Sequence, residues 1–172
     1  MAMDALVKPL LLLPLFQGLR PLQLTEIVRR AGRVIYRPGD IIIEEDQAGD
    51  AAVIIVSGDA VRTTGLEPGE AAQPIAEGSM IGELAMLVET IHSATIVARG
   101  TVKALRLTRS EMHDLMAEDP QLADHLTQKI TSRLQRLAQE LREVDRALAD
   151  MSAFEPFAQS AAFPAFAPAP LH

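Results

Sequence analysis

The sequence GSMIGELAML, residues 78–87, followed closely by HSATI, residues 92–96, decides the fold of this chain. Gly82 is expected to end a strand. Because it has no Cβ, it also lets the backbone approach a ligand closely. The residues after it favour a short helix, whose free N-terminal amides attract an anion. Glu83 follows directly, and its carboxylate would accept a hydrogen bond from a hydroxyl of the same ligand. An anion beside a sugar hydroxyl points to a nucleotide, although acidic residues also favour helix starts without any ligand.

Around this stretch, from residue 34 to residue 107, the chain alternates between short β-rich runs and turn signals. The runs are VIY (34–36), III (41–43), VIIV (53–56), TIV (95–97) and VKALRL (102–107). The turn signals are RPGD (37–40), AGD (48–50), SGD (57–59), EPGE (67–70) and EG (77–78). Many short strands at such spacing indicate an antiparallel sandwich or barrel.

Residues 4–30, before the β region, predict short helices separated by turns. Pro21 is tolerated in a first helical turn, and Leu22, Leu24, Ile27 and Val28 form a helical stripe. The apolar run 9–16 is about half a membrane span and contains two prolines, so we expect a short buried helix rather than a membrane or signal segment. With no cysteine in the chain, the cytoplasm is the expected compartment.

After the β region, two helices are predicted. Thr108 or Ser110 can cap the first, with Glu111 placed as in a capping box, and Pro120 begins the second. Apolar residues recur along the second helix at positions 122, 126, 130, 134, 137, 141, 144, 148 and 151. The alternating spacing of three and four from Leu134 onward is that of a coiled-coil seam, which predicts a homodimer through residues 130–151. The alternative is a single helix that folds back on its own barrel.

Residues 153–172 differ in composition from the rest of the chain. They contain seven alanines, four prolines and four of the five phenylalanines, but no Lys or Arg. Prolines forbid a continuing helix, and aromatic anchors with little charge are unlike a solvated tail. This tail would bind a protein partner or dock on this protein itself; a disordered end is the plainer alternative.

The charge balance of the chain limits the classes of ligand that it is expected to bind. The chain carries 16 Lys and Arg against 23 Asp and Glu, a formal net charge of −7, whereas a DNA-binding protein needs a basic face. Aromatic residues make up only 3%, which argues against base-stacking platforms for single strands. Neither a catalytic constellation nor metal-ligand spacing is present, so the sequence predicts a non-enzymatic binding protein with no cofactor and no metal.

In this setting the central stretch resembles the cyclic-nucleotide-binding domains of the catabolite-activator and kinase-regulatory-subunit superfamily. The segment Gly82-Glu83-Leu84-Ala85 and the strand Ala94-Thr95-Ile96 match the phosphate cassette of that family, and the RPGD, Gly49-Asp50 and Val56-Ser57-Gly58 turns support the match over about residues 10–150. The resemblance implies a mainly β fold: an eight-stranded β jelly roll, or double-stranded β-helix, with N-terminal helices and a long C-terminal helix. Its parts would be N-terminal helices (1–30), barrel (31–107), hinge helix and long dimerisation helix (108–151), and tail (152–172).

The same resemblance assigns ligand-binding roles residue by residue, with cAMP or cGMP as the ligand. Gly82 opens the cassette, Glu83 would bond the ribose 2′-hydroxyl, and the amides of Leu84 and Ala85 would hold the cyclic phosphate. His92 stands where the family has its phosphate-binding arginine. Ser93 occupies the small or hydroxyl position beside the phosphate.

His92 is a departure with consequences, because an arginine stays charged and grips phosphate bidentately whereas a histidine cannot. Losing one charge-assisted contact costs about 1.5–3 kcal/mol. Between residues 40 and 91 the one basic residue is Arg62, against eleven acidic residues, so a compensating cation would come from elsewhere, for example Arg99, Arg133 or Arg136.

Two hypotheses follow. The first is a cyclic-nucleotide sensor or regulatory domain that signals through its C-terminal helix and dimer. The second is a degenerate cyclic-nucleotide fold that binds no nucleotide and acts as a dimerising protein-interaction module. The roughly 20 residues after the long helix are too few for a helix-turn-helix, so a DNA partner is not expected.

Overall fold

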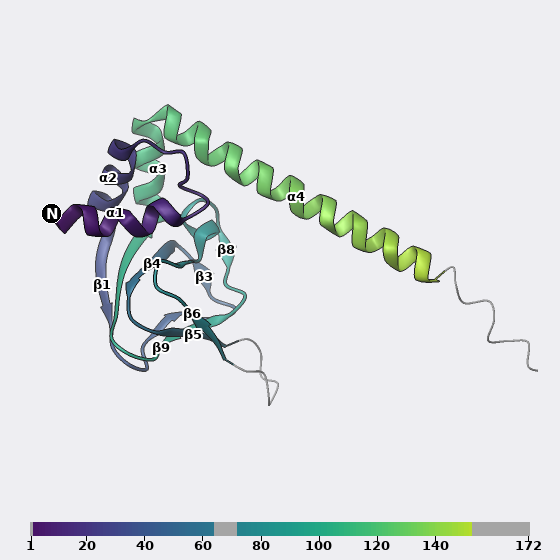
Figure 1. Ribbon diagram of the computed structural model, residues 1–172, viewed down its shortest axis with the longest axis horizontal. Coiled ribbons are helices and arrows are strands. Elements are labelled where there is room, and N and C mark those ends of the chain that lie inside the picture. The colour runs from purple at the N-terminus through teal and green to yellow at the C-terminus, as the bar shows by residue number, and fades with distance from the viewer. Residues whose placement is uncertain (1, 64–71, 153–172) are drawn as a thin grey trace, which may run out of the picture. The chain divides into compact units, whose positions relative to one another are not determined.

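The computed structural model describes residues 2–63 and 72–152 (Figure 1). The predicted turn 67–70 and the tail 153–172, with its predicted protein partner, lie outside the described residues. The described residues up to Lys129 form one compact unit and residues 130–152 form a second, so the boundary falls within the last helix.

The described residues form ten strands, all paired in antiparallel fashion. They are β1 Gly32–Tyr36, β2 Ile41–Ile43, β3 Ala48–Gly49, β4 Ala51–Ser57, β5 Ala60–Thr63, β6 Gln73–Ile75, β7 Met80–Ile81, β8 Thr90–Ile91, β9 Thr95–Ala98 and β10 Val102–Thr108. Two four-stranded sheets have the orders β1-β10-β4-β7 and β2-β9-β5-β6, and β3 and β8 form a separate short pair. The predicted fold class, mainly β with flanking helices, is confirmed; the short β3–β8 pair stands outside the two main sheets.

The two main sheets enclose one apolar core. Val53, Ile55, Ile81, Val102 and Ala104 come from the first sheet, and Ala60, Ile96 and Ala98 from the second; each is at most 5% exposed. Burying such side chains contributes about 1.5–3 kcal/mol for each large one, so the closed core is the main source of stability for the barrel.

Helices α1 (Ala2–Leu12) and α2 (Pro21–Arg30) precede the barrel. Together with α3 (Arg109–Glu118) they gather at one end of it in Figure 1. Helix α2 begins at Pro21 as predicted and buries Leu24, Ile27 and Val28. Leu22 is 70% exposed, so its place in the predicted stripe is wrong: at 100° per residue it lies on the opposite side of the helix from the other three.

The apolar run 9–16 is partly buried. Leu10, Leu13, Leu15 and Phe16 are each at most 7% exposed, whereas Leu11 and Leu12 face solvent. Among the described residues, none of the helices has both the length and the apolar character that crossing a bilayer requires.

Helix α3 (Arg109–Glu118) follows β10 directly. Thr108 is its cap, since its side chain accepts a hydrogen bond from the Glu111 amide while the Glu111 carboxylate accepts one from the Thr108 amide. The capping box predicted from the sequence is therefore present, with Thr108 rather than Ser110 as the cap.

Asp119 separates α3 from α4 (Pro120–Ser152). Its Oδ1 accepts hydrogen bonds from the amides of Gln121 and Leu122, and its Oδ2 accepts one of 2.7 Å from the Gln23 amide group on α2. The hydrogen bond from Gln23, supported by these backbone amides and by the charge of Arg20, lowers the pKa of Asp119 below its usual value. The junction is thereby held to the start of α2.

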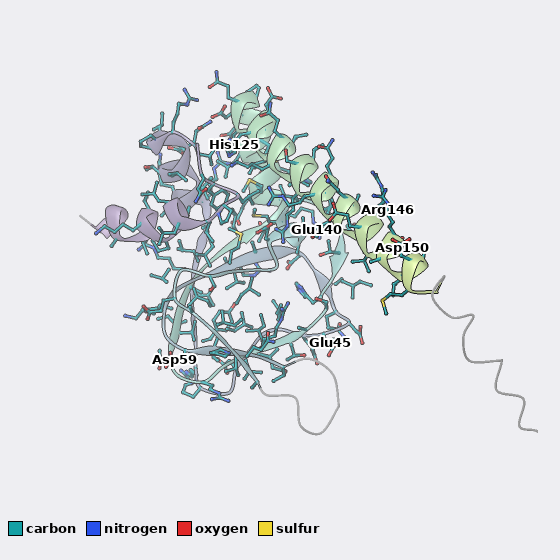
Figure 2. The ribbon with its side chains drawn as sticks, turned by 45° about the vertical axis from the view of Figure 1, so that its right-hand side comes forward. Glu45, Asp59, His125, Glu140, Arg146 and Asp150 are labelled. Carbon is teal, nitrogen blue, oxygen red and sulfur yellow. The ribbon has the colours of Figure 1, made fainter. Side chains whose placement is uncertain are left out.

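Helix α4 differs between its two ends. In its first turns Leu122 and Leu126 are at most 2% exposed, and the His125 ring Nε2 lies 3.1 Å from the Leu15 carbonyl oxygen (His125 is labelled in Figure 2). From Leu134 onward the large apolar positions are exposed, with values of 47% for Leu137 and 66% for Leu141. Glu140, Arg146 and Asp150 of this part, labelled in Figure 2, are exposed as well.

Candidate functional site

Residues 82–93, here called the cassette, connect β7 to β9. Gly82 has a φ of 66°, in the left-handed region that favours glycine, and it leads into one 3₁₀ turn, η1 (Glu83–Met86). The predicted short helix is therefore present in its tighter 3₁₀ form. Ala85 and Met86 are buried, which anchors the turn, while Leu84 on the same turn is 38% exposed.

One of the two amides expected to hold a phosphate is already used within the turn. The Ala85 amide donates to the Gly82 carbonyl oxygen at 2.9 Å. Glu83, the expected ribose ligand, is partly buried at the start of η1, and Ser93, at the other end of the cassette, is exposed. Leu84 and Ser93 thus present accessible positions, whereas Ala85 would have to share its proton with a ligand.

His92 closes the cassette from its far end. A Cβ built on Gly49 would lie 2.7 Å from the His92 Cε1 and 2.7 Å from the Ala85 Cβ, and one built on Gly82 would lie 3.3 Å from the same Cε1. The imidazole therefore packs against the backbone of both glycines, and no side chain fits at position 49. Backbone hydrogen bonds from the His92 amide to Gln47 and from the Asp46 amide to His92 fix this position.

The structure thus brings three of the predicted site residues, Gly82, Ala85 and His92, close together, with Gly49 of β3 between them. The sequence indicates Gly49 only as part of a turn. Its role depends on a neighbour 43 positions away in the chain, so local sequence carries no signal for it.

Arg109, the first residue of α3, supports the cassette from within the protein. Its guanidinium donates to the Gly49 carbonyl oxygen at 2.6 Å (from Nη2) and to the Ala85 carbonyl oxygen at 3.2 Å (from Nε), and its Nη1 lies 3.6 Å from a carboxylate oxygen of Glu89. The side chain is only 22% exposed. A permanent positive charge therefore lies directly behind the cassette.

His113, one helical turn after Arg109, makes a parallel contact. Its Nε2 lies 2.9 Å from the Leu87 carbonyl oxygen, just after η1. Residues four apart lie on one face of a helix. Arg109 and His113 therefore contact the cassette from the same face of α3, at the carbonyl oxygens of Ala85 in η1 and of Leu87 just after it.

Arg109 was not among the candidates for a compensating cation that the sequence suggested, which were Arg99, Arg133 and Arg136. The available signal was a basic residue directly after the helix-capping Thr108, but its reach to the cassette follows only from the way α3 packs on η1. The acidity of this region is also reduced by pairing: both carboxylate oxygens of Asp50 lie 2.8 Å from Nη2 of Arg106. In the part of the chain that the structure describes, no three His, Cys, Asp or Glu side chains gather in a way that could hold a metal ion.

Comparison with known proteins agrees with this geometry. The family model of the cyclic nucleotide-binding domain matches residues 33–119, half of the chain and the whole of the cassette, and the chain belongs to this family. The relation predicted from the cassette motif is confirmed.

Relatives include regulatory and channel proteins. The chain is 32% identical over 105 residues to a cAMP-dependent protein kinase regulatory subunit of Blastocladiella emersonii, covering 60% of this chain and 26% of that protein. It is 30% identical over 120 residues to a cyclic nucleotide-gated potassium channel of Rhizobium etli, covering 70% of this chain and 33% of the channel. The match therefore spans about a quarter to a third of the length of these relatives.

Among solved structures, the catabolite activator protein of Thermus thermophilus superposes with a TM-score of 0.61 at 27% identity, covering 77% of this chain and 63% of that chain. The likeness extends beyond the region of the family match.

Proposed function

We propose that this chain binds a cyclic nucleotide, cAMP or cGMP, at the cassette and acts as a non-enzymatic sensor or regulatory domain. The observation that carries the proposal is the pair of contacts from α3, Arg109 to Ala85 and His113 to Leu87. A ligand that moves η1 would have to move or break these contacts. The cassette and helix α3 would therefore be mechanically coupled.

The roles within the cassette follow from its chemistry. Glu83 would accept a hydrogen bond from the ribose 2′-hydroxyl, and the Leu84 amide and a shared Ala85 amide would donate to the cyclic phosphate. Ser93 adds an exposed hydroxyl beside them. Arg109, from behind, supplies the positive charge that an anionic ligand needs, with the His92 ring beside the same turn.

Signalling would pass from η1 to α3 and then to α4. The buried residues Met86 and Leu87 of the cassette and Met112 and Leu115 of α3 belong to elements that pack on each other. Because close-packed protein interiors transmit small shifts, displacement of η1 would change the position of α3.

A second copy of this chain is the partner that we propose for residues 130–151. The exposed residues Leu134, Leu137, Leu141 and Val144 follow the three-and-four spacing of a coiled-coil seam. A second copy offers the same stripe in return, so that each helix would bury the apolar face of the other. The cytoplasmic location remains a prediction from the sequence.

One observation favours the second hypothesis, a fold that has lost its ligand. The His92 ring already fills the space between Gly49 and Gly82. If that space is closed to phosphate, the domain would act only as a dimerising interaction module.

Titration calorimetry with cAMP and cGMP separates the two. The variant His92→Arg, which offers the phosphate a permanent charge and a bidentate contact, should bind about ten- to a hundredfold more tightly than the wild type, while His92→Gln should bind no more tightly than the wild type. No heat with millimolar nucleotide for the wild type would refute the sensor and leave the interaction module.

A further inference from the structure

Arg62 on β5 faces the interior of the barrel. Across the β5–β9 pair, Arg62 lies opposite Ile96 and Ala60 lies opposite Ala98. Directly opposite residues of an antiparallel pair lie on the same face of the sheet. Ile96, Ala98 and Ala60 all belong to the buried core cluster, so Arg62 shares the face that is turned toward it.

The guanidinium of Arg62 contains an unpartnered donor. Its Nε is buried, and it has no hydrogen-bond partner within residues 2–63 and 72–152. A buried donor that has lost water without a replacement is costly, and such groups are rare in native proteins. An acceptor that enters the barrel with a ligand would satisfy it.

The position of β5 indicates which part of a ligand Arg62 would meet. The cassette turn η1 packs against β4 and β10 of the first sheet, against β8 and against α3. β5 belongs to the second sheet, between β9 and β6. With the phosphate and ribose held at the cassette, the portion of a nucleotide left for the second sheet is the base.

We propose that Arg62 recognises the base of the bound cyclic nucleotide and selects guanine over adenine; this rests on the proposed function of the cassette. A guanidinium has donors only. Guanine presents two adjacent acceptors, O6 and N7, to such a fork, whereas adenine pairs its N7 acceptor with an N6 amino donor that would face a second donor. The chain should therefore prefer cGMP to cAMP.

Calorimetry on the full chain tests the proposal with three nucleotides: cGMP, cAMP and inosine 3′,5′-cyclic monophosphate, which keeps O6 and N7 but lacks the 2-amino group. We expect cGMP and the inosine nucleotide to bind about tenfold or more tightly than cAMP. Arg62→Met keeps the apolar stem and should remove this preference by weakening cGMP while leaving cAMP unchanged. Arg33→Met, at an exposed arginine on β1, is the control for a general loss of positive charge and should preserve the preference.

Thermal unfolding distinguishes recognition from support of the fold. Because Arg62→Met removes an unpartnered buried donor, its unfolding midpoint should be equal to or above that of the wild type. Equal weakening of all three nucleotides, a preference for cAMP, or no preference in the wild type would each overturn the role of Arg62 while leaving nucleotide binding in place. No binding of any nucleotide would instead overturn the proposed function, and this inference with it.

Discussion

The cassette and the distal part of α4, residues 130–152, differ in the kind of binding partner that each would take. The cassette is built by its own chain: His92 packs on Gly49 and Gly82, and Arg109 and His113 hold the turn from α3. The distal part of α4 instead carries leucines that are 47–66% exposed at positions 134, 137 and 141. The proposed function gives the first region a small ligand and the second another protein surface. Because the contacts from α3 would couple the two, a substitution in one region should have its main effect there and a smaller effect on the other.

The largest expected effect is on the assembly. Leu134→Asp combined with Leu141→Asp places two carboxylates in the predicted seam, and burying each charge costs several kcal/mol, about a hundredfold or more in dissociation constant. Sedimentation at micromolar concentration should show a dimer for the wild type and a monomer for the double variant, with nucleotide binding retained.

The control for this pair is Gln135→Asp with Gln139→Asp, which adds the same charge at positions outside the seam. It should remain a dimer. A wild-type monomer, or a dimer that survives both leucine substitutions, would refute the seam.

The next effect concerns the cassette. In Gly49→Val the new Cβ would meet the His92 ring and the Ala85 Cβ at 2.7 Å, so the cassette must deform. We expect about 1–3 kcal/mol of lost stability in denaturant unfolding, together with loss of nucleotide binding. Gly100→Val, where nothing lies within 4 Å of the added Cβ, is the matched control and should change neither. Wild-type stability and binding in Gly49→Val would show that His92 does not occupy this position.

Removal of the charge behind the cassette should have a smaller effect. Arg109→Met loses the hydrogen bonds to the Gly49 and Ala85 carbonyls, and hydrogen bonds to a charged group contribute about 1.5–3 kcal/mol each, less where water can replace the partner. We expect about tenfold weaker nucleotide binding by calorimetry. If Arg109→Met binds as the wild type does, the positive charge behind the cassette does not assist the ligand.

The smallest effect is on the pH dependence of stability. The hydrogen bond from Gln23 holds the pKa of Asp119 below its ordinary value in the folded chain. The stabilisation is therefore complete above the ordinary aspartate pKa, near 4, and is lost as the pH falls through the lower folded value. Asp119→Asn should flatten the decline in unfolding midpoint between pH 5 and pH 3, which Asp124→Asn, at an exposed carboxylate, should not do. Equal slopes in both variants would exclude Asp119 as a source of acid sensitivity.

The local features of the fold were predictable from sequence. The Thr108 capping box, the helix start at Pro21 and the turn at Gly82 each depend on residues a few positions apart, and the structure has all three. Leu22 was misassigned because a stripe of apolar residues was counted without resolving its angle around the helix.

The contacts that support the cassette could not be predicted in the same way. Gly49 and His92, and Arg109 and Ala85, are distant in sequence and meet only after the sheets close and α3 packs on η1. Periodicity also failed to separate Leu126, which the first unit buries, from Leu134, which is exposed, because both belong to one continuous apolar pattern.

The most direct test of the central claim is a titration of the isotopically labelled full chain with cGMP and with cAMP, followed by amide NMR shifts. Binding at the cassette predicts saturable shifts of the Gly82, Glu83, Leu84 and His92 amides, and of the Arg109 and His113 amides through the contacts from α3, while Gly39 and Gly100 stay unchanged. Millimolar nucleotide that leaves the cassette amides unmoved, or that shifts only residues elsewhere, would contradict the account.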